Sequence, residues 1–186
     1  MSPVRRPGPI MVASVSGLLA TAIVACSQPA TAPRAAGPSD ALPPAGAAPA
    51  VAPLPVADGP CPYLPTEFVQ AANGERVTGV RISETGVNQP HPACFFLTYH
   101  DAVQVRTWIV VATPQTAGAT VDAAAPVATS DLVELPGGWS GGSQPTADGA
   151  VFAVARQGTA VVVTTNQRQT IGARRIAEQV IATLGL

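Results

Sequence analysis

A run of proline and alanine over residues 27–59 limits where this chain can fold. It contains 8 Pro and 11 Ala in 33 residues, and its charged side chains are Arg34, Asp40 and Asp58. The run has no helical or strand periodicity, and it cannot bury enough apolar surface to offset the entropy lost on ordering. We therefore expect a disordered linker, extended by its prolines, that leaves residues 60–186 to form a single domain.

Residues 1–25 have the pattern of a lipoprotein signal peptide. A pair of arginines precedes an uncharged apolar stretch that is short for a membrane-spanning helix and typical of secretion. The stretch ends in Ile23-Val24-Ala25-Cys26, which resembles a lipobox. Acylation at Cys26 and at the new amino terminus would supply two or three chains, enough for stable anchoring. We expect an anchored protein on the outer face of the cytoplasmic membrane; the alternatives are a plain signal peptide or an uncleaved anchor helix.

Once Cys26 carries lipid, two cysteines remain for the domain. Cys61 and Cys94 would lie in an oxidising compartment, where disulfides persist. Their pairing would close a loop of about 34 residues and stabilise the domain by about 3–4 kcal/mol. A metal or redox pair is the alternative, but the spacing is not C-x-x-C and neither histidine lies at a familiar ligand spacing. We predict a disulfide, with no metal and no cofactor.

Apolar periodicity predicts an α+β domain. Helical spacing alternates along the chain with strand-like spacing, and strands next to each other in sequence form antiparallel pairs. We expect one antiparallel sheet with the helices packed on one of its faces. The expected helices are residues 65–72, 113–125 and 170–184; the expected strands are 77–83, 94–99, 103–112, 131–135, 151–156 and 159–165; residues 84–92 and the glycine-rich residues 137–149 are expected to be loops.

The charge balance excludes one class of partner. Only 11% of the residues are charged, the net charge is −1 and all ten basic residues are arginine. A nearly neutral chain without a basic stripe is a poor nucleic-acid binder. We therefore expect the membrane, through the lipid anchor, and an envelope protein or lipid as partners.

Several short blocks between residues 61 and 186 occur in an order that resembles a known family. They are Cys61-Pro62-Tyr63-Leu64, Asn73-Gly74, Pro92-Ala93-Cys94-Phe95-Phe96, Val121-Asp122 with Ala124-Ala125-Pro126-Val127, Gly138-Trp139-Ser140-Gly141-Gly142, and Gln169-Thr170-Ile171 with Ala173-Arg174. The family is the actinobacterial group of secreted lipoproteins known as a domain of unknown function, family number 2020. The resemblance implies a cell-envelope location and supports the pairing of the two domain cysteines, but it implies no activity.

The block around Ser140 permits a catalytic and a structural interpretation. It fits the G-x-S-x-G elbow of α/β-hydrolases, with His91 or His100 as a base that precedes the serine. The flanking prolines and glycines suit neither the strand nor the helix that this elbow needs, and the domain is short for that fold. In the structural interpretation, Gly138 and Gly141 let a loop turn tightly.

Both tryptophans are candidates for a binding surface. Trp139, on the glycine-rich loop, either packs on the sheet or is exposed to a ligand or partner, since tryptophan is enriched at binding hot spots. Trp108 falls on the strand face opposite to Val105 and Ile109, where it covers the second face of the sheet or sits in a groove.

The loop before Cys94 is a further candidate surface. Asn88 and His91 lie there in a rigid proline frame. A metal site would need at least two more ligands beside the histidine, so the alternatives are a ligand or partner surface and an ordinary surface loop.

These observations favour a non-enzymatic binding module for an envelope partner. The alternatives are a carrier or chaperone for a lipid or glycolipid, and a serine hydrolase that uses Ser140. A cavity large enough for acyl chains would favour the carrier, and a Ser140 hydroxyl within hydrogen-bond reach of His91 or His100 would favour the enzyme. A solid core with an exposed patch around Trp139 would favour the binding module.

Overall fold

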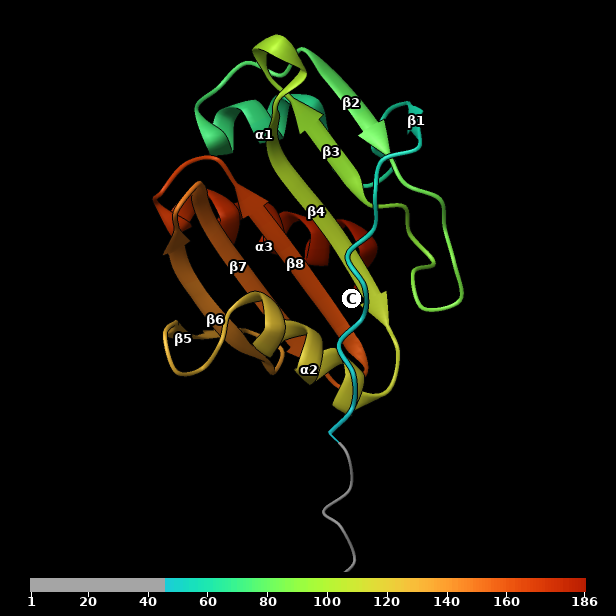
Figure 1. Cartoon of the computed structure of the whole chain (residues 1–186), viewed down its shortest axis with the longest axis vertical. Helices are drawn as coiled ribbons and strands as arrows, with labels where there is room; N and C mark the ends of the chain where they lie inside the picture. The colour runs from blue at the N-terminus through green and yellow to red at the C-terminus, as the bar shows by residue number, and fades with distance from the viewer. Residues whose placement is uncertain (1–45) are drawn as a thin grey trace, which may run out of the picture. The chain divides into compact units, whose positions relative to one another are not determined.

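Eight strands, each antiparallel to its neighbours, form one sheet in the computed structural model, which describes residues 46–186 (Figure 1). The strand order is β1-β2-β3-β4-β8-β7-β6-β5, so two four-stranded meanders meet where β4 pairs with β8. The strands are β1 (Ala57–Asp58), β2 (Gly79–Ile82), β3 (Cys94–Leu97), β4 (Val103–Val111), β5 (Asp131–Leu135), β6 (Trp139–Thr146), β7 (Gly149–Arg156) and β8 (Thr159–Thr165); the helices are α1 (Thr66–Asn73), α2 (Pro114–Ala124) and α3 (Thr170–Leu184). The expected α+β class and antiparallel sheet are confirmed.

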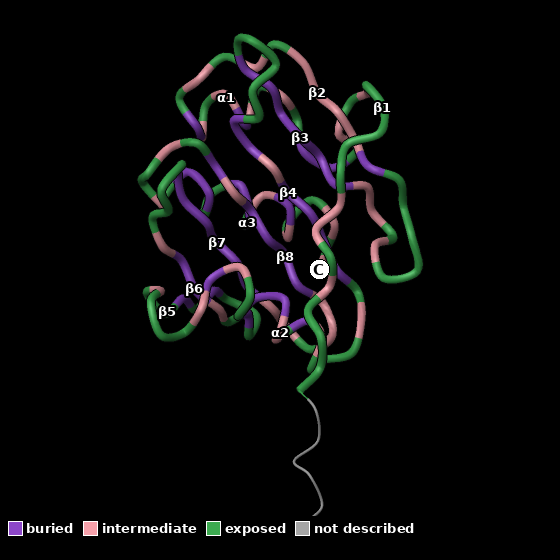
Figure 2. Tube along the Cα trace, viewed as in Figure 1, coloured by how far each residue is buried: buried purple, intermediate pink, exposed green. Residues whose placement is uncertain are grey.

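The three helices divide between the two faces of the sheet. α1 and α3 pack on one face, over a core that includes Phe96, Ile109 and Phe152. α2 packs on the opposite face, over alternate residues of the same strands, such as Val110 and Val162. The expectation of helices on one face therefore holds for α1 and α3, whereas α2 covers the second face. Figure 2 shows the buried stretches of β4, β7 and β8 running through the middle of the sheet.

The glycine-rich segment that we expected to be a loop is the strand β6. It pairs with β5 on one side and with β7 on the other. A Cβ atom added at Gly141 would lie 2.0 Å from the carbonyl oxygen of Ala153, so the close approach of β7 requires glycine there. The glycines that indicated a loop thus serve strand packing, and the expectation of a loop over residues 137–149 was wrong.

Residues 46–58 form a strap that crosses the α2 side of the sheet. The backbone N–H of Ala50 donates to Thr120 Oγ1 at 2.9 Å, and the N–H of Val56 donates to the Ile82 carbonyl at 2.9 Å. Ala50 and Ala52 pack against the core cluster beneath α2, and Ala57–Asp58 pair with β2 as β1. The folded unit therefore begins before residue 60, where we placed its boundary. The expected signal peptide, Cys26 and the first part of the expected linker lie outside the described residues.

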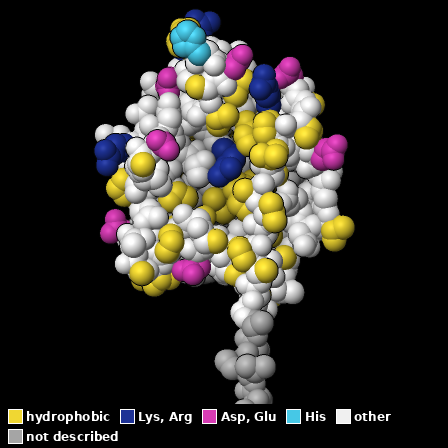
Figure 3. Space-filling view, viewed as in Figure 1, with side chains coloured by type: hydrophobic (Ala, Val, Ile, Leu, Met, Phe, Trp, Pro, Cys, Tyr) yellow, Lys and Arg dark blue, Asp and Glu magenta, His cyan; other side chains and the backbone are white. Residues whose placement is uncertain are grey.

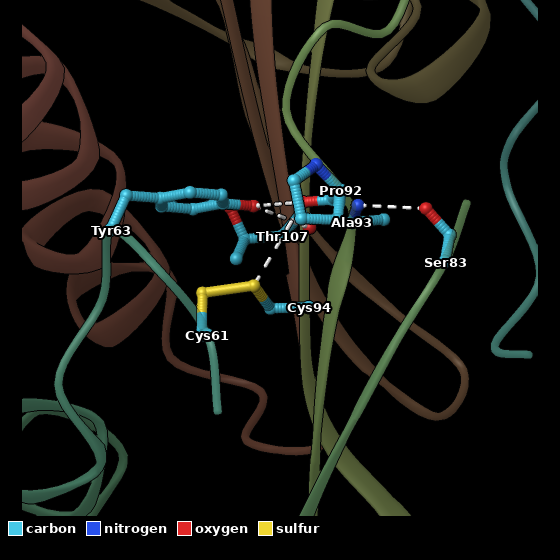
Figure 4. The surroundings of a disulfide bond; sticks show 7 residues. All are labelled: Cys61, Tyr63, Ser83, Pro92, Ala93, Cys94 and Thr107. Carbon is cyan, nitrogen blue, oxygen red and sulfur yellow. Dashed lines mark hydrogen bonds between the residues drawn. A yellow bond between two sulfur atoms is a disulfide. The ribbon is translucent and has the colours of Figure 1, made fainter. Parts of the chain in front are cut away.

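The predicted disulfide joins the segment before α1 to the start of β3. The Cα atoms of Cys61 and Cys94 are 5.6 Å apart. Beside it the hydroxyl of buried Tyr63 donates to the Pro92 carbonyl at 2.9 Å, and the Thr107 carbonyl lies 3.4 Å from the same oxygen (Figure 4). The disulfide and the buried tyrosine together fix the loop before β3 to the central sheet.

Among the described helices, none combines the length and the apolar character needed to cross a membrane.

Removing the strap should destabilise the domain. We expect residues 60–186 to unfold at a temperature about 5 °C below residues 26–186 carrying Cys26→Ser, because the shorter chain loses strap hydrogen bonds and alanine packing worth about 2 kcal/mol in total. Thermal unfolding followed by circular dichroism measures the difference. Equal midpoints would show that residues 46–58 add nothing to the fold.

Tyr63 should make the domain sensitive to alkaline pH. Desolvation by burial raises the pKa of its hydroxyl above the ordinary value of 10.0, so the unfolded chain releases this proton before the folded chain does. Stability should therefore fall as pH rises above about 10. Between pH 8 and pH 11, urea unfolding should show that the free energy of unfolding falls by less in Tyr63→Phe than in the parent. Tyr99 is exposed, so Tyr99→Phe is the control, and its free energy of unfolding should fall as much as that of the parent. Equal decreases in all three chains would show that Tyr63 is not the source of the alkaline sensitivity.

Candidate functional site

The α2 side of the sheet is only partly covered, and a hollow remains between the strap and α2. A cavity of about 290 Å³ lies there, and a second cavity of about 370 Å³ adjoins it over the ends of β4 and β8 and the turn between β6 and β7. Arg106, Thr146 and Thr164 line both. We call the combined hollow the Arg106 groove. Its other lining residues are Ala50 and Ala52 of the strap, Thr120, Ala123 and Ala124 of α2, and Phe95, Val103, Gln104, Trp108, Asp148, Ala150, Val151, Val162, Thr165 and Asn166 of the sheet, its turns and strand ends.

Strand alternation explains the placement of the polar side chains. Arg106 and Trp108 are two residues apart on β4, so both point to the α2 side, while Val105 and Ile109 point into the core beneath α3. Thr164 is the direct cross-strand neighbour of Arg106 on β8. The groove floor is therefore built on the two central strands of the sheet, each of which is paired on both sides.

The guanidinium of Arg106 has no partner among the described residues. It takes part in neither of the two ion pairs of the described chain, which join Arg81 to Asp58 and Arg174 to Glu178. Its Nε atom is buried and makes no hydrogen bond. Desolvation by burial lowers the pKa of Arg106 from its ordinary value. A buried donor without an acceptor costs about 1–3 kcal/mol, so the fold loses stability by placing this arginine here.

Trp108 adds a second unused donor on the same strand. Its side chain is 4% exposed, and its Nε1 atom is buried without a hydrogen-bond partner. A buried indole N–H usually finds an acceptor. Two neighbouring donors on one strand face, both unsatisfied, distinguish the groove from an ordinary surface depression.

Asp148 is the acidic side chain of the groove lining. It lies in the exposed turn between β6 and β7, and it is not within ion-pair distance of Arg106. Figure 3 shows a hollow on this face with a basic side chain at its centre and apolar side chains around it. Arg106 is the arginine among the lining residues, so the groove presents one cation among apolar and uncharged polar side chains, with Asp148 at its edge.

A second, largely apolar hollow of about 270 Å³ lies between α2, β5 and β6. Ser140 lines it, but no hydrogen bond joins Ser140 to His91 or His100 within the described chain. β4, β8 and β7 lie between β6 and β3, so four strand spacings separate the serine from the histidines flanking β3, about 19 Å. The geometry that would favour a Ser140 hydrolase is not formed.

Trp139 is packed rather than exposed. It is 2% exposed and belongs to the core cluster beneath α3, with the Arg156 guanidinium 5.0 Å from its ring centroid. Gly138 adopts a positive φ of 84° in the turn between β5 and β6, which explains the glycine without a ligand. Of the two alternatives for Trp139, packing on the sheet is therefore the one that is formed, and the expectation of an exposed Trp139 surface is corrected.

Asn88 and His91 lie away from the Arg106 groove. Asn88 is exposed, and its carbonyl accepts a hydrogen bond from the N–H of Val111 at 2.9 Å. The His91 ring packs edge-on against Tyr63 at 6.1 Å between centroids. Within residues 46–186, no group of three or more His, Cys, Asp and Glu side chains is placed to hold a metal ion.

Sequence reasoning placed Trp108 but missed Arg106. The signal was available, because Arg106 is the one charged residue of β4 and lies two residues from Trp108, on the same face of the strand. A charged side chain in a strand that is covered on both faces lowers the stability of the fold. Such a residue therefore indicates a function, such as binding, other than stabilising the fold.

The fold and the groove define an α+β domain with an open, basic-centred face. Residues 43–186 match the family described as Domain of unknown function (DUF2020), so the chain belongs to this family. The comparison with curated proteins found no match.

Replacing Arg106 should stabilise the protein. Arg106→Met keeps an unbranched stem but removes the desolvated charge and its unpaired donor, and we expect a gain of about 1 kcal/mol, or about 3–5 °C in Tm. The matched control is Arg168→Met at an exposed position, which should change stability by less than about 0.5 kcal/mol. A loss of stability in Arg106→Met would show that the arginine serves the fold.

Proposed function

We propose that this protein is a lipid-anchored binding module of the cell envelope, without catalytic activity, whose binding face is the Arg106 groove. The observation that carries the proposal is the pair of buried donors, on Arg106 and Trp108, that the described chain leaves unused. A buried donor without a partner calls for an explanation, and an acceptor supplied by a ligand in the groove is the one that we propose. The groove volumes lie near the lower end of the range of small-molecule sites, about 300–1,000 Å³.

The anchor is part of the proposal. Its support is the apolar stretch that ends in Cys26 behind two arginines. From Cys26 to residue 46 the chain spans twenty residues, which reach at most about 70 Å when fully extended. The binding module would therefore work close to the membrane surface.

A lipid or glycolipid carrier is the second candidate. The apolar hollow between α2, β5 and β6 supports it, and exposed Leu132 on β5 extends the apolar surface there. An acyl chain would lie along this hollow. Nothing in the described geometry favours the Ser140 hydrolase.

Site-specific crosslinking tests the binding face. Val103 and Val111 lie at opposite ends of β4 and have similar exposure, 46% and 41%, but only Val103 lines the groove. A photo-crosslinking residue at position 103 in the full anchored chain should capture a ligand from its native envelope, and the same residue at 111 should not. Equal capture at both positions, or none at 103, would overturn the proposal. Cys26→Ser should release the protein from the membrane fraction.

A further inference from the structure

We propose that the Arg106 groove recognises an amphiphilic anion: a carboxylate or phosphate group on an apolar body. This inference rests on the proposed binding function and names the chemistry of its ligand.

The unpaired N–H and O–H groups of the groove favour a ligand that carries hydrogen-bond acceptors. A guanidinium offers five N–H groups and no acceptor, and its planar fork matches a carboxylate or phosphate in a bidentate arrangement. Trp108 adds an N–H that can only donate. The hydroxyls of Thr146 and Thr164 line the same hollow beside Arg106 and make no hydrogen bond within the described chain. A ligand that satisfies this set must present several acceptor atoms and negative charge.

The alanine-rich walls of the groove favour a ligand with an apolar portion. The strap contributes Ala50 and Ala52 to one side of the groove, and α2 contributes Ala123 and Ala124 to another. Small side chains leave space without polar groups, and Trp108 is too deeply buried to offer its ring as a platform for a sugar. An alkyl chain fits such a surface, because it buries apolar area against the alanines and needs no hydrogen bonds.

The position of Asp148 predicts how the groove discriminates. Its carboxylate sits on an exposed turn at the rim, whereas Arg106 sits on a central strand at the floor. A bound anion would meet attraction at the floor and repulsion at the rim. Asp148→Asn should therefore tighten anion binding, and this effect would not arise if the ligand were a cation or a neutral amphiphile.

Calorimetric titration of the full mature chain carrying Cys26→Ser tests the inference. The probes are octyl phosphate, octanoate, octyltrimethylammonium and inorganic phosphate, each below its micelle concentration. We expect at least one of the two octyl anions to bind, the other probes to bind at least tenfold more weakly, and the tighter anion to identify the headgroup. Arg106→Met should weaken binding at least tenfold, Arg168→Met should leave Kd within twofold, and Asp148→Asn should lower Kd several-fold.

Each contrary result has a defined meaning. Unchanged binding in Arg106→Met, or equal binding of octyltrimethylammonium, would overturn the recognition of an anion. Equal binding of inorganic phosphate and octyl phosphate would overturn the apolar body. If neither octyl anion binds while crosslinking at position 103 still captures a ligand, the inference fails and the proposed function stands. Thermal unfolding of each variant confirms that the compared chains are folded.

Discussion

The burial of β4, β7 and β8 on both faces governs the rest of this structure. These strands carry apolar side chains on both faces and are buried at most positions, so each face of the sheet must be covered to keep them from water. α3 covers one face, with α1 beside it. On the other face α2 is too short to cover the whole sheet, and the strap supplies additional cover over β4. The Arg106 groove is the part of this second face that stays open between these two elements.

The sequence predicted helices and strands well where the apolar periodicity agreed with the residues that end a helix or form a turn. α3 begins and ends where its apolar stripe and Gly185 indicated, and the hairpin of β7 and β8 forms from two apolar runs separated by a short turn. The disulfide followed from the compartment and the cysteine count. Each of these features depends on local chemistry, which a single sequence carries.

The features that the sequence did not predict depend on partners distant along the chain. The glycines of β6 indicated a loop because glycine is common in turns, but Gly141 is required by the backbone of β7. The strap has no strand periodicity in its sequence, and it is held in place by hydrogen bonds to Thr120 and Ile82, which are distant along the chain. Arg106 was overlooked because a lone charge in a strand looks like a solvent-facing position. Only the strand order shows that Arg106 lines a hollow on a covered face. Trp139, for which the sequence left packing and exposure open, lies in the core.

The strap also decides how the molecule would respond to tension. If a membrane anchor pulled on the chain, the load would enter at residue 46 and meet the strap contacts one after another: Ala50 with Thr120, Val51 with Gln89, Val56 with Ile82, and Gly59 with Val80. Such serial loading peels contacts at low force. The peel would stop at Cys61, where a covalent bond transfers the force to β3. Mechanical strain on the tether would thus open one wall of the groove while the sheet beneath it stayed intact.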